Sequence, residues 1–260
     1  MLKTPINLNL TTIPPVFHPL ISNADIYDSS CSATARVYFI DKDDGYYLKT
    51  SPKGTLKKEA TMTKYFAQKG LSANVLEYLS DENDWMLTSR IHGEDCTHAM
   101  YLEDPKRLCD TLSERLYLLH SLDCSDCPVK HTASYLATAT ENYKKGLYDP
   151  SYSPEILGSL SSDDAYNYVL QRQDQLFDNV LLHGDYCLPN VMLDNWKFSA
   201  FIDVGNGGVG DRHVDVFWGI WTLSYNLKTQ KYTDRFIDGY GKSLIDMDKL
   251  KLISVIEAFG

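Results

Sequence analysis

Residues 181–208 constrain this chain more than any other segment, and they read LLHGDYCLPNVMLDNWKFSAFIDVGNGG. Two short apolar runs, VML and FSAFI, flank the polar turn DNWK, which is the pattern of a β-hairpin. Asp185 and Asn190 bracket a tight loop before the first run, and Asp203 follows the second run. Because a hairpin of this length brings its two ends together, we expect Asp203 to lie near Asp185 and Asn190.

These three polar side chains have the chemistry of a phosphoryl-transfer site. The amide of Asn190 and the carboxylate of Asp203 supply hard oxygen ligands of the kind that Mg²⁺ prefers. The carboxylate of Asp185 could orient a hydroxyl group and accept its proton. Since catalysis of phosphoryl transfer depends mostly on positioning and charge neutralisation, the three groups together predict a magnesium-dependent transferase.

A cation for the phosphates of a nucleotide is also present in the sequence. Lys49 lies at the end of the predicted strand YYLK, and Glu59 lies in the predicted helix that follows, over residues 55–69. A lysine on a strand that pairs with a glutamate on the next helix is the arrangement found in protein kinases. We therefore expect an ion pair between Lys49 and Glu59 at the nucleotide phosphates.

The rest of the sequence predicts an α+β chain with two lobes. Strand-like runs fill the first third, namely ARVYFI and YYLKT around the turn DKDDG, then VLEYLS and DWMLTSRI around DEND. Helical spacing dominates from residue 105, with helices expected at 131–146 and 163–177, and the aromatic cluster VFWGIW is expected in the core. We expect a nucleotide-binding lobe over residues 1–91 and a catalytic and substrate-binding lobe over 92–260.

Composition argues against some classes of partner. The formal net charge is −10, from 35 acidic and 25 basic residues, which does not suit a general nucleic-acid-binding protein. No apolar run approaches the roughly 18 residues of a membrane span, and the N-terminus lacks the pattern of a signal peptide. Only Cys124 and Cys127, of 6 cysteines, have metal-like spacing, so we expect reduced thiols and a cytoplasmic protein.

The motifs HGDYCLPN and FIDVGNGGVGDRHVD resemble those of the aminoglycoside phosphotransferases, most of all the 3′-phosphotransferase branch. The resemblance covers nearly the whole chain and includes YYLK, WMLTSRIHG, LLHSLDCSDCP and the terminal IEAFG. It implies the two-lobed protein-kinase-like fold. It also implies direct transfer of the γ-phosphate of ATP or GTP, with Mg²⁺, to a hydroxyl group of an aminoglycoside antibiotic.

The resemblance gives the residues of the hairpin and of the lysine pair specific roles. Asp185 would be the catalytic aspartate that positions the acceptor hydroxyl. Asn190 and Asp203 would hold Mg²⁺. Lys49 would bind the α- and β-phosphates of the nucleotide, and Glu59 would orient that lysine.

Further residues would complete the nucleotide site and support the catalytic loop. Tyr47 would stack on the nucleobase, and Ser32 and Ala33 would lie in a loop over the phosphates. The segment from Ser89 to Ile91 would form the hinge whose backbone binds the base. His183 would brace the catalytic loop by a structural role, while Asp211 and Asp215, spaced i and i+4, are expected to cap and brace the next helix.

The acceptor is a polycation if it is an aminoglycoside, so its site should be rich in carboxylates. The resemblance assigns acceptor binding to Glu257 and Phe259 near the C-terminus and to Glu155 and Asp149 in the preceding loop. Two departures weaken that assignment: Ile256 stands where the family has an aspartate, and Asn206 replaces an arginine.

Alternatives therefore remain open at the level of the sequence. The same fold and reaction could serve another alcohol, such as an amino alcohol, a sugar or a macrolide. A nucleotide-binding protein without catalytic activity is a third interpretation, against which the intact Asp185 argues. The sequence leaves open the choice between ATP and GTP, the hydroxyl that is modified and the oligomeric state.

Overall fold

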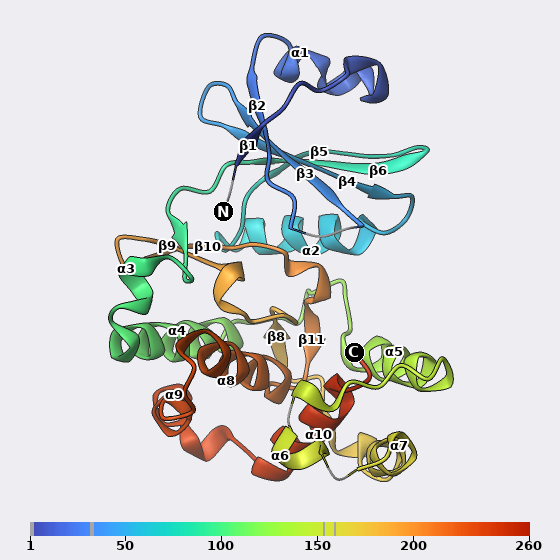
Figure 1. The fold of residues 1–260 in the computed structure, drawn as a ribbon, viewed down its shortest axis with the longest axis vertical. Coiled ribbons are helices and arrows are strands. Elements are labelled where there is room, and N and C mark those ends of the chain that lie inside the picture. The colour runs from blue at the N-terminus through green and yellow to red at the C-terminus, as the bar shows by residue number, and fades with distance from the viewer. Residues whose placement is uncertain (1–2, 32–33, 153, 159) are drawn as a thin grey trace. The chain divides into compact units, whose positions relative to one another are not determined.

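The computed structural model describes residues 3–31, 34–152, 154–158 and 160–260, and these form two compact units (Figure 1). The sheet unit comprises Met1–Asp95 and Met192–Gly205, and the helical unit comprises Cys96–Val191 and Asn206–Gly260. The sequence therefore predicted the α+β class correctly. The division differs from the predicted boundary at 91/92 because a segment late in the chain, residues 192–205, returns to the sheet unit.

An antiparallel sheet of 6 strands, in the order β1-β2-β3-β4-β6-β5, forms the frame of the sheet unit. Its strand β4 is central and carries Lys49, which lies opposite Val37 on one neighbour and Met86 on the other. The strands are β1 (Thr4–Pro5), β2 (Asp25–Asp28), β3 (Arg36–Asp41), β4 (Tyr46–Pro52), β5 (Val75–Ser80) and β6 (Asn83–Ser89).

Helical segments cover this sheet. Short turns near the N-terminus bury Phe17 and Ile21 against Leu48 and Trp85. The longer helix α2 follows β4 and buries Ala60 against Met86. These segments are η1 (Leu10–Thr12), η2 (Pro15–Phe17), α1 (His18–Ile21) and α2 (Lys57–Gln68).

The predicted β-hairpin is present as β9 (Val191–Asp194) and β10 (Lys197–Phe201), joined to β7 (Glu94–Asp95) in the order β10-β9-β7. Its turn residues Asn195 and Trp196 both have positive φ, which matches the right-handed twist of a tight hairpin. Phe201 then packs edge-on against Phe66 of α2, with 6.1 Å between the ring centroids. This contact explains why the hairpin belongs to the sheet unit.

In the helical unit, α4 packs against α8 and α9, and α8 packs against α10. The unit also contains a two-stranded antiparallel sheet of β8 and β11, in which Leu182 lies opposite Gly208. The predicted helix over 163–177 is shorter in the structure. The α-helix ends at Leu170, and a 3-10 turn follows at Gln173–Gln175. The α-helices are α3 (Ala99–Leu102), α4 (Pro105–His120), α5 (Thr132–Lys144), α6 (Pro154–Leu157), α7 (Ser162–Leu170), α8 (His213–Leu227), α9 (Thr233–Tyr240) and α10 (Met247–Glu257).

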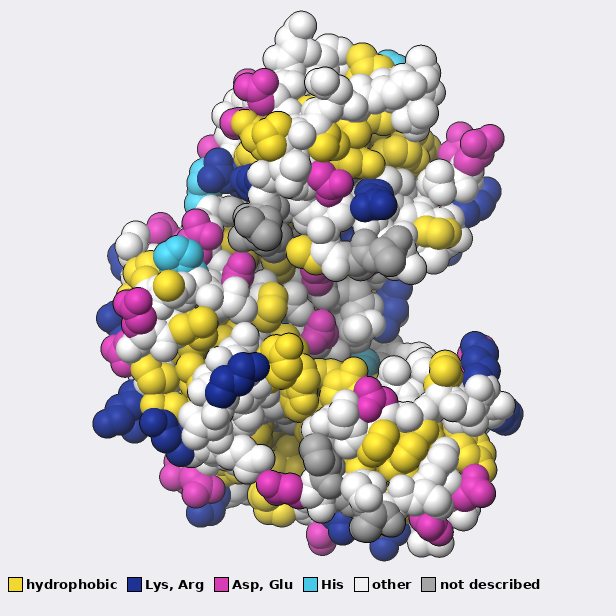
Figure 2. Space-filling view, in the orientation of Figure 1, with side chains coloured by type: hydrophobic (Ala, Val, Ile, Leu, Met, Phe, Trp, Pro, Cys, Tyr) yellow, Lys and Arg dark blue, Asp and Glu magenta, His cyan; other side chains and the backbone are white. Residues whose placement is uncertain are grey.

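Strand β8 ends immediately before the HGD motif, so the ribbon fixes where the following loop begins. The remaining short elements are β8 (Val180–Leu182), β11 (Gly208–Gly210), η3 (Pro150–Tyr152), η4 (Gln173–Gln175), η5 (Leu188–Asn190), η6 (Val204–Asn206) and η7 (Lys242–Leu244). Within the described residues, every helix is too short or too polar to cross a lipid bilayer. On the face seen in Figure 2, Lys and Arg side chains lie scattered among Asp and Glu.

Candidate functional site

The Lys49 ammonium lies at the centre of a cluster of charges in the sheet unit. Its Nζ donates hydrogen bonds to both carboxylate oxygens of Glu59, at 2.8 and 2.9 Å, and to Oδ1 of Asp203 at 2.9 Å. Strand β4 positions the lysine, and Glu59 projects from the first turn of α2. The predicted pair of Lys49 and Glu59 is thus present, and Asp203 joins it as a second carboxylate.

Electrostatics keep this lysine charged. Burial lowers the pKa of Lys49, but the neighbouring carboxylates of Asp203 and Glu59 outweigh burial and raise it above its usual value. Burial also raises the pKa of Glu59, and the Lys49 ammonium opposes that rise. Two carboxylates around one ammonium give the cluster a net negative charge, so the cluster favours the binding of a further cation.

The backbone after β10 presents Asp203 in an unusual conformation. Its φ of 54° places it in the left-handed region, which aspartate and asparagine adopt more readily than most residues. The side chain remains 54 % exposed, although one of its oxygens binds Lys49. A Cβ at Gly205 would lie 3.1 Å from the Cβ of Glu59, so glycine permits the close approach of this turn to α2.

The loop after β8 organises Asp185 in the helical unit. Asn190 donates from its side-chain nitrogen to the backbone oxygen of Asp185 at 3.0 Å and to its carboxylate at 2.9 Å. Gly184 has a φ of 83°, and a Cβ at this position would collide with the backbone of Asn206 at 2.3 Å. The bond from Asn190 fixes the orientation of the Asp185 carboxylate and leaves the amide oxygen of Asn190 for another partner.

The fully buried carboxylate of Asp215, on α8, binds the backbone at the start of this loop. It accepts hydrogen bonds from the backbone nitrogens of His183, at 2.7 Å, and Gly184, at 2.8 Å, and from Nε2 of His120 at 3.1 Å. Burial raises the pKa of Asp215, but the bond from His120 and neighbouring positive charge lower it below its usual value. Asp215 therefore braces the loop that carries Asp185, a role beyond the predicted bracing of its own helix.

The residues predicted for the nucleobase lie in or beside the sheet. The ring of Tyr47 on β4 packs on Phe39 at 5.2 Å, and burial raises the pKa of its hydroxyl. Ser89, at the end of β6, donates from its backbone nitrogen to the carbonyl of Asn74 at 3.0 Å, and Ile91 follows two residues later, half-buried. Ser32 and Ala33 lie outside the described residues.

The residues predicted for the acceptor are divided between the surface and the interior of the helical unit. Asp149 and Glu155 are exposed; Asp149 accepts from the backbone of Ser151 at 2.9 Å, and Glu155 from Gln230 at 3.4 Å. Phe259, in contrast, is 1 % exposed and packs among the rings of Tyr143, Tyr148 and Tyr166. In this structure Phe259 anchors the C-terminus in the core.

Glu257 is buried as well, with 6 % of its surface exposed. Its Oε1 accepts hydrogen bonds from the hydroxyl of Tyr135, at 2.7 Å, and from the indole nitrogen of Trp218, at 3.1 Å. Burial raises the pKa of Glu257 to about 7, and the charge of Asp185 contributes to the rise. The sequence did not identify Tyr135 and Trp218, because they lie on two other helices and belong to no local motif.

Replacing Glu257 with glutamine is expected to change how stability depends on pH. The pKa of this group is about 7 in the folded chain against 4.5 as the ordinary value, so the folded state binds more protons across that interval. The stability contributed by the protonated group is complete below pH 4.5 and is lost as pH rises through about 7.

Glutamine stays neutral, so the unfolding free energy of Glu257→Gln should rise by about 2.5 kcal/mol relative to that of the native chain between about pH 5 and about pH 8. Urea unfolding at both pH values measures the difference. Glu141→Gln is the control, because Glu141 is an exposed partner of Lys145. Equal effects of Glu257→Gln at both pH values would contradict the account.

The structure thus brings Lys49, Glu59 and Asp203 together in the sheet unit, and Asp185 and Asn190 together in the helical unit. The expected proximity of Asp203 to Asn190 stays a prediction. Lysine held between carboxylates suits the binding of phosphate with a metal ion, and a carboxylate oriented by an amide suits the acceptance of a proton from a hydroxyl.

Comparisons with known proteins match this chemistry. Residues 31–253 match the phosphotransferase enzyme family. The probable aminoglycoside 3′-phosphotransferase of Lactococcus lactis is 45% identical over 257 residues, which cover 98% of each chain. The aminoglycoside 3′-phosphotransferase of Streptomyces fradiae is 26% identical over 227 residues, or 82% of this chain and 85% of that protein.

Solved structures establish the fold. An aminoglycoside-3′-phosphotransferase of type VIII superposes with a TM-score of 0.74 at 23% identity, over 90% of this chain and 91% of that one. An aminoglycoside phosphotransferase of Streptomyces rimosus, solved with ADP and streptomycin, gives 0.75 at 18% identity, over 97% and 99%. The predicted two-lobed, protein-kinase-like α+β fold is confirmed.

Proposed function

Because the chain belongs to the aminoglycoside phosphotransferase family, we propose that it transfers the γ-phosphate of ATP or GTP to a hydroxyl group of an aminoglycoside. The observation that carries the proposal is the contact of Lys49 with both Glu59 and Asp203. It supplies a fixed ammonium for the phosphates on the strand and helix where a kinase requires it. A nucleoside triphosphate as the phosphate donor supports the predicted cytoplasmic location.

Lys49 binds the nucleotide, and Asp203 contributes the second charge that the site needs. One ammonium between two carboxylates attracts a triphosphate weakly, since the cluster itself has a negative balance. The balance changes sign when a divalent cation joins Asp203, whose carboxylate is 54 % exposed and has one oxygen on Lys49. This charge requirement supports the binding of the nucleotide as its magnesium complex.

The donors on hand suit Mg²⁺. Asp203 offers a carboxylate oxygen, and Asn190 offers its amide oxygen because its nitrogen faces Asp185. Mg²⁺ typically binds few protein ligands together with several phosphate oxygens, so one carboxylate and one amide suit it when the nucleotide is bound. When bound, Mg²⁺ neutralises charge on the phosphates.

Asp185 acts on the acceptor. Its carboxylate is oriented by Asn190, and its loop is held by the buried Asp215. A carboxylate in this position accepts a hydrogen bond from the acceptor hydroxyl, aligns its oxygen for attack on the γ-phosphorus and receives its proton. Tyr47, the segment Ser89 to Ile91, and the loop of Ser32 and Ala33 complete the nucleotide site in this proposal.

The burial of Glu257 and Phe259 in the helical unit supports a second class of acceptor, with fewer positive charges. Glu257 is buried with a pKa raised to about 7, and Phe259 is in the core, so neither presents a free charged group to a polycation. Asp149 and Glu155 are the two exposed acids that remain of the predicted acceptor set. The same reaction on another alcohol with fewer positive charges is therefore the alternative.

A resistance profile tests the proposal directly. Expression of the chain in a susceptible bacterium is expected to raise the minimal inhibitory concentration of kanamycin or neomycin, because phosphorylation removes a hydroxyl that the drug uses in binding. Asp185→Ala should abolish the rise at equal expression. An unchanged profile across a panel of aminoglycosides, with turnover on another alcohol, would select the alternative.

A further inference from the structure

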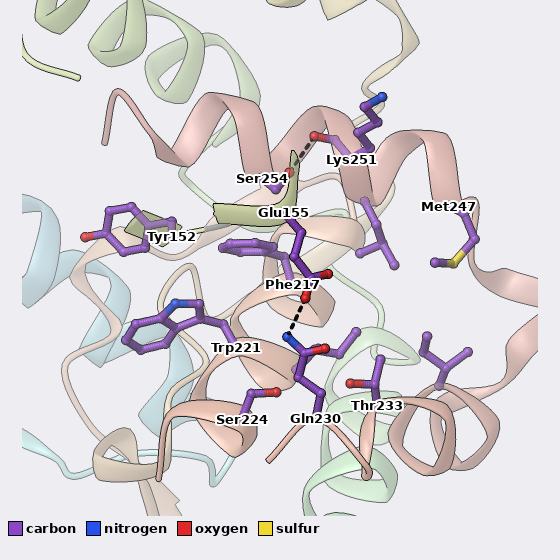
Figure 3. A pocket seen from close by; sticks show the side chains of 13 residues that line it. Tyr152, Glu155, Phe217, Trp221, Ser224, Gln230, Thr233, Met247, Lys251 and Ser254 are labelled. Atoms are coloured by element: carbon purple, nitrogen blue, oxygen red, sulfur yellow. Dashed lines mark hydrogen bonds between the residues drawn. The ribbon is translucent and has the colours of Figure 1, made fainter. Parts of the chain in front are cut away.

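The helical unit contains a pocket of about 350 Å³ that the phosphoryl-transfer chemistry leaves unused (Figure 3). Of the residues assigned to that chemistry or to the acceptor, Glu155 alone is among the lining residues that the structure describes. The volume is within the range of small-molecule sites, about 300–1,000 Å³. A cavity of about 150 Å³ holds one benzene ring, so this pocket has room for two fused rings with a short substituent.

Aromatic and aliphatic side chains from three helices form most of its wall. Trp221 stacks on the exposed ring of Tyr225, with 4.9 Å between centroids and 9° between planes, and Tyr152 closes one side at 5.9 Å from Trp221. Figure 3 shows Tyr152 and Trp221 together at one end of the pocket and Met247 at the other. The apolar residues of the wall are Phe217, Ile220, Trp221, Ile237, Met247 and Leu250.

This wall departs from the sequence expectation for the cluster VFWGIW. Phe217 is buried as predicted, whereas Trp218 and Trp221 are only half-buried. The indole nitrogen of Trp218 donates a hydrogen bond to Glu257, whereas the indole of Trp221 lines the pocket. Half-exposed indoles beside a cavity are suited to stacking with a flat ligand.

The charge that faces the pocket is negative. Figure 3 shows Glu155 extending into the middle of it, where its carboxylate accepts a long hydrogen bond of 3.4 Å from Gln230. The other charged lining residue, Lys251, directs its ammonium away from the cavity in Figure 3 and lies 5.5 Å from the ring of Tyr168. One carboxylate beside Tyr152 and Trp221 favours a cation, by charge and by the attraction of cations to aromatic rings.

We propose that this pocket is a binding site for an amphipathic monocation, a flat apolar ring system with one positively charged substituent. The rings lie against Trp221 and the aliphatic wall, and the cation takes the place of Gln230 at Glu155. A polycationic antibiotic does not fit this description, because a single carboxylate faces a mostly apolar wall. Glu155 is shared with the predicted acceptor set, but the proposed ligand differs from the acceptor, and its binding in this pocket does not depend on phosphoryl transfer.

Calorimetric titration of the full chain, without nucleotide or antibiotic, tests the proposal. The probes are three ligands that share a naphthalene ring: 2-(1-naphthyl)ethylammonium, the neutral 2-(1-naphthyl)ethanol and the anionic 1-naphthylacetate. We expect the ammonium to bind at one site, about threefold or more tighter than the alcohol, and the acetate to bind weakest. No saturable binding at millimolar ammonium, or equal affinity for the acetate, would overturn the proposal.

Two variants separate the contribution of the rings from that of the charge. Trp221→Ala should weaken the ammonium and the alcohol alike, by about tenfold, because both lose the stacking surface. Glu155→Gln should keep the affinity for the alcohol and abolish the preference for the ammonium. Glu141→Gln and Phe177→Ala remove an exposed acid and an exposed ring elsewhere in the helical unit, and both should bind as the native chain does. Native affinity in Trp221→Ala would refute the site.

Discussion

Asp185→Asn is expected to lower kcat for aminoglycoside phosphorylation by about a thousandfold and to change KM for ATP little. Asparagine has the size of aspartate and can still accept the hydrogen bond from Asn190, so the loop keeps its shape. It cannot receive the proton of the acceptor hydroxyl or align that hydroxyl through a negative charge. The loss therefore falls on the chemical step and leaves nucleotide binding in place.

Steady-state kinetics of purified protein measure this effect, with Asp238→Asn as the matched control. Asp238 is an exposed aspartate on α9 of the same unit, and its variant should have native kcat and KM. An Asp185→Asn enzyme that retained more than about a tenth of the native kcat would show that another group accepts the proton.

Asp203→Asn is expected to lower kcat/KM for the nucleotide by about a hundredfold to a thousandfold and to raise the Mg²⁺ concentration needed for half-maximal rate. The carboxylate provides both a hard oxygen for the metal ion and a charge beside Lys49. Asparagine is the informative replacement because it tolerates the left-handed φ of 54° at this position, whereas alanine would add backbone strain.

The measurement is a magnesium titration of initial rates at fixed ATP. Asp194→Asn serves as the control, since Asp194 is an exposed aspartate at the end of β9 in the same hairpin. Its titration curve should coincide with that of the native chain. A native curve for Asp203→Asn would remove Asp203 from the metal site and leave it as the partner of Lys49 alone.

Local patterns made part of this structure predictable. The strand that ends at Lys49 and the helix that carries Glu59 follow each other closely, so alternation and helix composition were enough to predict their ion pair. The hairpin of β9 and β10 was predictable because a polar turn separates two apolar runs. The domain boundary was harder to predict from the sequence, since the return of residues 192–205 to the sheet unit depends on contacts such as that of Phe201 with Phe66.

Long-range packing determined what the sequence missed. Glu257 is buried because Tyr135 and Trp218 reach it from α5 and α8, and no spacing within one helix reports such a contact. Helical periodicity placed VFWGIW in the core, but it cannot show that one side of α8 borders a cavity closed by Tyr152 and Glu155. The fold and the ion pair of Lys49 with Glu59 were predictable from motifs, whereas the buried surroundings of Glu257 required coordinates.

Release of ADP by the purified native chain, followed in a coupled assay with kanamycin and with neomycin, tests the central claim most directly. The account predicts turnover that requires both Mg²⁺ and the antibiotic, with one phosphoryl group added to the drug for each ADP released. Absence of antibiotic-stimulated turnover at millimolar concentrations of either drug, from protein that binds ATP, would contradict it.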